Sequence, residues 1–128
     1  MVLSDPLAEV DRETAADLLC GVTATLEISR GDTTWRDEHF PVLELALALV
    51  RSTEPESLRF RSMCLEEDPA FAVVPGPGFV NVITYDRMSF QVPVDEFRRA
   101  RGAFIEQVDR VLQAMFGWTI SDIDRSTR

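Results

Sequence analysis

The segment from Val42 to Arg51, VLELALALVR, is apolar on nearly every side when its residues are placed on a helix. A helix at the surface of a protein buries only one stripe of side chains, whereas a helix that is apolar all round must be buried. We therefore expect this helix, which follows Pro41, to pack against a sheet and to be covered by another element on a second side.

Short strands are predicted on both sides of this helix. Apolar and polar residues alternate from Val22 to Ile28, Gly31-Asp32 forms a turn, and residues 33–38 return as a second strand. Further strands are predicted at 58–62, 71–74, 79–85 and 88–92. Because hairpin-length connections join most of these strands, they should form a largely antiparallel sheet of about five or six strands.

Two amphipathic helices are predicted nearer the ends of the chain. Asp5-Pro6 is typical of an N-cap followed by proline in the first turn, so a first helix should extend from there to Leu19. The second helix has regularly spaced apolar residues from Phe97 to Met115 and should end at Gly117. Within it, Gly102 suggests a close approach to the sheet, since glycine is otherwise unfavourable there.

Together these elements predict an α+β fold, with helices packed on one face of an antiparallel sheet and a long C-terminal helix. The length of 128 residues fits one domain, so residues 1–128 are predicted to form a single domain. Residues 1–5 and 124–128 are expected to be flexible ends.

The charge of the chain restricts its partners. All 13 cationic side chains are arginine, which is typical of a GC-rich bacterial genome, and 22 Asp and Glu leave a net charge of −9. Nucleic acid and anionic membrane both require a basic footprint, so the composition argues against either partner. A basic protein remains as the expected partner.

The N-terminal residues contain no secretory signal, and no apolar run is long enough to span a bilayer, so a cytoplasmic location is expected. The two cysteines, Cys20 and Cys64, have no metal-ligand spacing. In a cytoplasmic protein they are expected to be reduced, with a disulfide as the alternative.

No catalytic, metal-binding or cofactor-binding residues are predicted. His39 is the single histidine, and its neighbours on a strand would point to opposite faces, so it should have a surface or capping role. Glu44 is unusual because it lies in the first turn of an apolar helix. It could neutralise the helix N-terminus or pair with Arg59 or Arg61, while a buried general acid is the alternative.

Candidate partner-binding residues lie in two acidic stretches. Glu66, Glu67 and Asp68 form the densest run of negative charge, and Asp86 lies on a turn before the last strand. Such charges can speed association with a basic partner and reject wrong partners. Tyr85 and Trp35 are possible aromatic anchors beside them, because these residue types are enriched at binding hot spots.

The segment SFQVPVDEF, followed by the long helix RRARGAFIEQVDRVLQAM, belongs to a layout that resembles small acidic bacterial immunity proteins of polymorphic toxin systems. The resemblance covers roughly Thr23 to Met115 and carries over no contact residue. It implies an inhibitor that masks a basic toxin such as a nuclease. The absence of a catalytic or metal-binding set in a chain with one histidine predicts a monomeric or homodimeric domain without enzymatic activity.

Two alternatives to the inhibitor remain open. The chain could be a small-molecule-binding or enzymatic domain, with a pocket between sheet and helices and Glu44 at its base. It could also be a homo-oligomeric regulatory module that assembles through a sheet edge.

Overall fold

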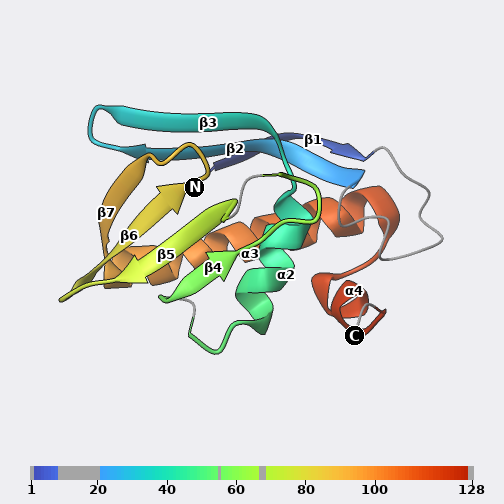
Figure 1. Ribbon diagram of the computed structural model, residues 1–128. Helices are drawn as coiled ribbons and strands as arrows, with labels where there is room; N and C mark the ends of the chain where they lie inside the picture. Colours follow the sequence, from blue (N-terminus) through green and yellow to red (C-terminus); the bar gives the residue numbers. More distant parts are fainter. Residues whose placement is uncertain (1, 9–20, 55, 67–68, 127–128) are drawn as a thin grey trace.

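The computed structural model describes residues 2–8, 21–54, 56–66 and 69–126. Its strands form two antiparallel sheets (Figure 1). The three-stranded sheet has the order β1-β2-β3 and consists of β1 (Val2–Ala8), β2 (Val22–Arg30) and β3 (Thr33–Phe40). The four-stranded sheet has the order β4-β5-β6-β7 and consists of β4 (Leu58–Phe60), β5 (Phe71–Pro75), β6 (Phe79–Thr84) and β7 (Ser89–Pro93).

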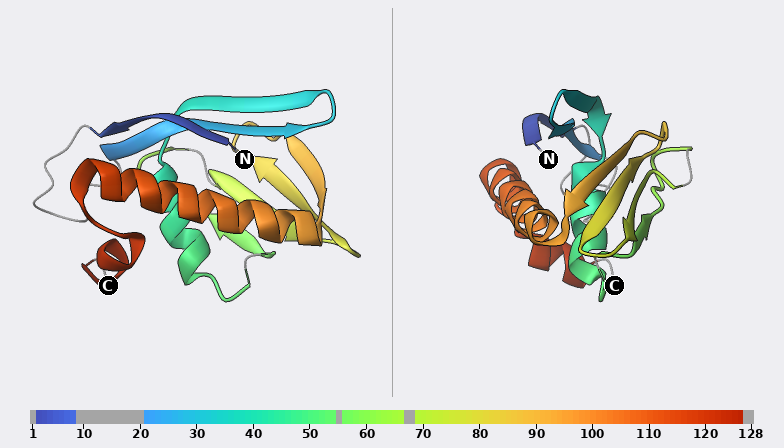
Figure 2. Two further views of the ribbon diagram at one scale, coloured as in Figure 1. Left: turned by 180° about the vertical axis from the view of Figure 1, so that it is seen from behind. Right: turned by 90° about the vertical axis from the view of Figure 1, so that its left-hand side faces the viewer.

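Helix α2 (Val42–Arg51) occupies the centre of the molecule. It contacts β2 of one sheet, β4 of the other, and helices α3 (Val94–Phe116) and α4 (Ile120–Ser126). An end-on view shows α2 between α3 and the four-stranded sheet, beneath the three-stranded sheet (Figure 2). The prediction that this apolar helix is covered on more than one side is therefore confirmed. Each leucine that α2 buries contributes roughly 1.5–3 kcal/mol relative to an exposed side chain.

Helix α3 runs across both sheets and closes the core. It contacts β1, β6 and β7 as well as α2. Its buried side chains are Phe97, Phe104, Val108 and Leu112, which lie on one stripe of the helix. The helix ends where the sequence predicts, because Gly117 adopts a left-handed conformation with φ of 74° and its N–H donates to the carbonyl of Gln113 at 2.8 Å.

A chain of aromatic contacts joins the two sheets inside the core. The rings of Trp35 and Phe40, both on β3, lie 6.1 Å apart with their planes nearly perpendicular. Phe40 in turn lies 6.3 Å from Phe60 of β4. All three side chains are at most 4% exposed, so this contact is part of the core and holds β3 over the four-stranded sheet.

The predicted α+β class and the antiparallel pairing of strands are confirmed, but the arrangement differs from a single sheet. The described strands belong to two sheets. Helix α2 lies between α3 and the four-stranded sheet, beneath the three-stranded sheet, and not on one face of a single sheet. Hairpin-length connections reveal which strands pair, whereas the division into sheets depends on contacts between distant segments.

The helix predicted to begin at Asp5-Pro6 is wrong at its start, because residues 2–8 form strand β1. The pairing of β1 with β2 shifts register between Ser4 and Leu7. Proline is tolerated at such irregularities of an edge strand, because no ladder hydrogen bond is needed from it. The rest of that predicted helix lies outside the described residues. Residues 2–5 and 124–126, expected to be flexible ends, belong to β1 and α4.

Candidate protein-binding surface

Tyr85 joins the turn after β6 to strand β3 of the other sheet. Its hydroxyl donates a hydrogen bond of 2.8 Å to Oδ2 of Asp37, and its ring lies 5.7 Å from that of Trp35 at an interplanar angle of 80°. The Tyr85 side chain is half-buried. The turn of the four-stranded sheet is therefore held against β3, with part of an aromatic ring at the surface.

The turn that presents Asp86 is stabilised by Thr84, whose side chain is almost fully buried. The Thr84 hydroxyl donates to Oδ1 of Asp86 and accepts the N–H of Met88 at 3.0 Å. Arg87 adopts a positive φ of 68°, which is uncommon for a residue with a side chain. These bonds restrict the position of the exposed Asp86 carboxylate.

The loop that carries Glu66 leaves the same end of the four-stranded sheet as the Asp86 turn. Phe60 pairs with Phe71, and Phe71 pairs with Thr84, so the end of β4 and the end of β6 lie in one row across the sheet. Glu66 is exposed. Glu67 and Asp68, predicted with it, lie outside the described residues. The loop that carries Glu66 and the turn that carries Asp86 thus leave the sheet at the same end.

Glu66 and Asp86 make no ion pair with an arginine among the described residues. By contrast, Glu96 pairs with Arg30 at 2.8 Å and Glu106 pairs with an arginine one helical turn away. An exposed carboxylate without a cation beside it adds its full charge to the field of the surface. Glu66 and Asp86 therefore leave uncompensated negative charge on this surface.

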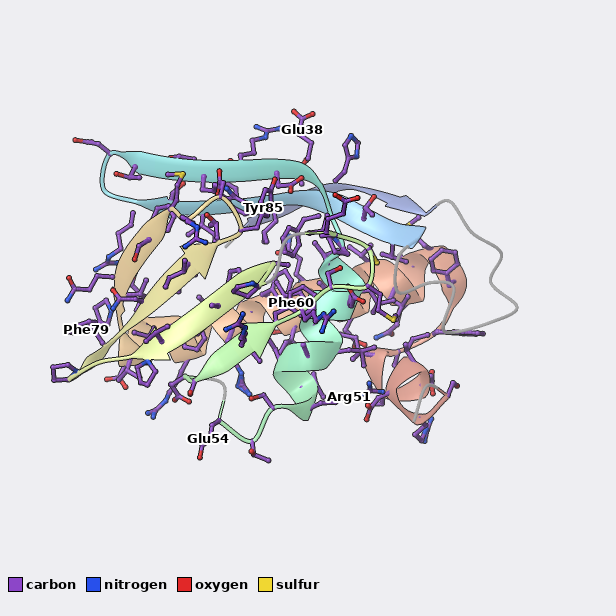
Figure 3. All side chains as sticks on the ribbon, viewed as in Figure 1. Glu38, Arg51, Glu54, Phe60, Phe79 and Tyr85 are labelled. Carbon is purple, nitrogen blue, oxygen red and sulfur yellow. The ribbon has the colours of Figure 1, made fainter. Side chains whose placement is uncertain are left out.

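Strand β3 extends this acidic end. Glu38 is exposed, and its contact of 3.9 Å with the equally exposed Arg36 is too loose to neutralise it. Figure 3 shows Glu38 and Tyr85 in the same half of the molecule. We call the surface formed by Asp37, Glu38, Glu66, Tyr85 and Asp86 the acidic surface. Arg36 lies on β3 and Arg87 lies in the turn after β6, so the margin of the acidic surface carries positive as well as negative charge.

Trp35 does not belong to the acidic surface. Its side chain is 4% exposed and contacts Phe40 and Tyr85. The prediction of Trp35 as an anchor for a partner is corrected by this burial, since a core side chain cannot contact another protein. Of the two predicted aromatic anchors, only Tyr85 reaches the surface.

His39 is exposed at the end of β3, and its backbone N–H donates to Oδ1 of Asp37 at 2.9 Å.

Glu44 fastens the loop after β4 to helix α2. It is 8% exposed and accepts hydrogen bonds from the hydroxyl of Ser62 and from the N–H of Met63, the latter at 3.1 Å. The donors are thus loop groups and not Arg59 or Arg61, which sequence reasoning had named. A buried carboxylate whose oxygens are engaged in this way has a structural role.

The described part of the chain contains no free cysteine, and Cys64 is disulfide-bonded. The expectation of reduced thiols is therefore corrected, and the alternative of a disulfide holds for Cys64. Cys20 lies outside the described residues. Sγ of Cys64 lies 3.6 Å from Oε1 of Glu44, so the disulfide and the Glu44 hydrogen bonds act on the same short loop.

A cavity of about 70 Å³ lies between the two sheets and α3, beside the ion pair of Arg30 and Glu96. This cavity is smaller than the roughly 300–1,000 Å³ of small-molecule sites, whereas a hollow of about 390 Å³ between α2 and β4, with Glu44 in its lining, falls within that range. Among the described residues, no three His, Cys, Asp or Glu side chains are grouped so that they could hold a metal ion.

No protein-family model, no curated protein and no solved structure matches this chain. None of the described helices is both long enough and apolar enough to cross a membrane.

Proposed function

We propose that this chain is a non-enzymatic, acidic protein-binding module that acts as an inhibitor or immunity protein and masks a basic toxin such as a nuclease. One observation supports it above the others. The Tyr85–Asp37 hydrogen bond holds a half-buried aromatic ring next to Asp86 in the chain, whose exposed carboxylate makes no ion pair among the described residues. Tyrosine is a common anchor of interfaces, and surrounding negative charge selects a basic partner.

The residues of the acidic surface would contribute to binding in different ways, because they differ in burial. Tyr85 already packs against Trp35, so it would contribute contact area with little loss of side-chain freedom. The exposed carboxylates of Glu38, Glu66 and Asp86 would act mainly during approach, because charges at the rim of an interface change the association rate more than the dissociation rate. Screening by salt over about 8 Å at physiological ionic strength should therefore slow binding.

The test is co-expression of the chain with the product of the adjoining gene. The proposal expects a basic product that is toxic alone, is tolerated in the presence of the chain, and co-purifies with it. A tagged variant with Tyr85→Ala should lose co-purification, whereas a variant with Phe79→Ala, an aromatic residue elsewhere on the surface in Figure 3, should retain it. An adjoining product that is harmless and does not bind would contradict the inhibitor role.

The proposal includes the cytoplasmic location expected from the sequence. A disulfide is uncommon in that compartment, so the state of Cys64 tests the location directly. Mass spectrometry of protein whose thiols are alkylated at the moment of lysis distinguishes the two cases: an alkylated Cys64 would support the cytoplasmic location and contradict the disulfide of the structure. An unmodified, bonded Cys64 would instead support an oxidising compartment.

A further inference from the structure

A hollow of about 420 Å³ opens where helices α2, α3 and α4 meet, and it shares no residue with the acidic surface. Seen from behind, α4 lies beneath the C-terminal part of α3 and beside α2 (Figure 2). Val50, Ile105 and Ile120, one from each helix, give the hollow an apolar lining. Ile120 is 4% exposed and Val50 is 43% exposed, so the lining reaches from the core to the surface. The volume lies within the roughly 300–1,000 Å³ of small-molecule sites.

The guanidinium group of Arg101, which also lines the hollow, has an unused donor. Its Nε is buried, yet no atom of the described residues accepts its hydrogen. Arg101 makes no ion pair in the described part of the chain, and Glu56, whose charge it influences, is bonded to Arg98 at 2.6 Å. Buried N–H groups in folded proteins are almost always paired. The Nε of Arg101 therefore points to an acceptor supplied from outside the chain.

The residue after Arg101 is Gly102, which lines the same hollow. Glycine is unfavourable inside a helix relative to alanine. No atom lies within 4 Å of the position that a Cβ would take at Gly102, so packing within the chain does not require glycine there. A larger side chain at this position would take up part of the hollow. The glycine thus leaves space beside the unpaired donor.

Negative charge is also present in the lining. Asp109 lies eight residues after Arg101 on α3, or roughly 12 Å along the helix axis. Its carboxylate accepts the N–H of Ile120 and the side-chain amide of Gln113, each at 2.7 Å. Both donors are neutral, and no described cation pairs with Asp109, so its charge is not neutralised. Glu106, the other acid in the lining, has an ion pair within α3.

The hollow therefore combines one unpaired cation with one carboxylate that no described cation neutralises. A simple anion would be attracted by Arg101 but repelled by Asp109. A ligand that carries both charges satisfies both groups. The apolar lining adds a requirement for an apolar side chain, since burial of that side chain stabilises the complex.

We propose that the hollow between α2, α3 and α4 binds a small zwitterion with an apolar side chain, as in a free amino acid or a dipeptide. The carboxylate of the ligand accepts the Nε hydrogen of Arg101, which is suited to carboxylates because its guanidinium donates in a fixed plane. The ammonium group lies towards Asp109, and the side chain covers Val50 and Ile105. This site does not depend on the proposed inhibitor role.

The test is isothermal titration calorimetry of the full chain with leucine and with leucyl-leucine. At least one probe should bind saturably with one site per chain, and a preference between them distinguishes a free amino acid from a peptide. The N-acetyl and C-terminal amide forms of that probe each lack one charge and should bind at least about tenfold more weakly. Absence of saturable binding by both probes would overturn the proposal, by leaving water as the acceptor for Arg101. Equal affinity of the blocked forms would overturn it too.

Two variants test the residues. Arg101→Met should weaken binding at least about tenfold without lowering the thermal stability of the free protein, because no group in the described chain loses a partner of Nε. Arg99→Met is the matched control, since Arg99 is exposed on α3 and does not line the hollow; this variant should bind as the parent does. Equal losses of affinity in the two arginine variants, or a less stable Arg101→Met protein, would assign a structural role to Arg101 and overturn the proposal.

Gly102→Leu tests the space independently of Arg101. It should block the hollow and abolish binding without lowering thermal stability, because leucine is the better helix former and a Cβ meets no atom there. A stable Gly102→Leu protein that binds the probe as the parent does would place the ligand elsewhere and contradict the assignment of the hollow.

Discussion

The hydroxyl of Tyr85 and the carboxylate of Asp37 are joined by a hydrogen bond of 2.8 Å, although 48 positions separate them along the chain. The bond ties the turn after β6 to β3, and hence one sheet to the other. It also sets the orientation of the aromatic ring in the middle of the acidic surface. Stability and partner binding are therefore expected to respond together when this pair is changed.

Replacing Tyr85 with Phe should lower the free energy of unfolding by about 0.5–1.5 kcal/mol, because Asp37 loses a donor while the ring contact with Trp35 remains. Urea denaturation measures the change. Tyr85→Ala, which also removes the ring, should cost more. Equal stability of the parent and the Phe variant would show that the bond does not join the sheets in solution.

Replacing Gly102 with Ala should raise the free energy of unfolding by up to about 1 kcal/mol, because alanine is the better helix former. The structure corrects the expectation of a close approach here, since a Cβ at Gly102 would meet no atom within 4 Å. Gly117→Ala is the contrasting variant. It should destabilise the protein, because φ at Gly117 is +74°. Thermal unfolding compares the two, and a destabilised Gly102→Ala protein would contradict the open position of this residue.

Replacing Glu44 with Ala should destabilise the protein by about 1–3 kcal/mol, because the Ser62 hydroxyl and the Met63 N–H would lose their acceptor. Ser62→Ala removes one donor and should cost less. Hydrogen exchange should show loss of protection at Met63 in the Glu44→Ala protein. Unchanged exchange at Met63 would contradict the conclusion that hydrogen bonds to Glu44 hold the loop after β4 against α2.

The stability of helix α4 should fall at acid pH, because the Asp122 carboxylate becomes protonated. Its pKa is lowered from the ordinary value of 3.8, first by the backbone N–H of Thr119, which donates to Oδ2 at 2.9 Å, and then by the Thr119 side chain and Arg125. A lowered pKa in the folded state means that the stabilisation is complete above the unfolded pKa and is lost as the pH falls through the folded one. The protection of the Ile123 amide, whose N–H donates to the Thr119 carbonyl, should therefore fall below about pH 4 when its NMR exchange rate is compared with the intrinsic rate at each pH.

Asp122→Asn supplies the control for this pH effect. The amide oxygen can still accept the Thr119 N–H, but the side chain no longer titrates. Opening of α4 in the variant should depend less on pH than in the parent. An identical pH profile in both proteins would assign the effect to another group.

The local patterns of the sequence predict much of the fold because they report burial. The all-round apolar helix α2, the stripe of α3 from Phe97 to Leu112 and the alternation of β2 each mark which side chains are inside. The division into two sheets was not predictable in this way. It depends on contacts such as Tyr85 with Asp37 and Phe40 with Phe60, between residues distant in the sequence. Strand β1 was missed because Asp5-Pro6 has the local signature of a helix start.

The candidate site, too, could be predicted from the sequence only where local patterns report exposure. Exposure of Glu66 and Asp86 followed from their places in polar turns, whereas the burial of Trp35 depends on Tyr85 from the other sheet. Alternation over residues 58–62 likewise indicated that Arg59 and Arg61 are exposed, as they are in the structure.

The most direct test of the acidic surface is the association rate of the chain with the basic protein that the proposed function expects to co-purify with it, measured by stopped-flow fluorescence between about 50 and 500 mM salt. The triple variant Glu38→Gln, Glu66→Gln, Asp86→Asn removes three charges and retains the acceptor that Thr84 requires. The control variant Glu54→Gln, Asp95→Asn, Glu106→Gln removes three exposed carboxylates elsewhere. We predict roughly tenfold slower association of the triple variant at low salt, convergence with the parent at high salt, and parent-like rates for the control. Equal rates for the triple variant and the parent at low salt would contradict the role of the acidic surface.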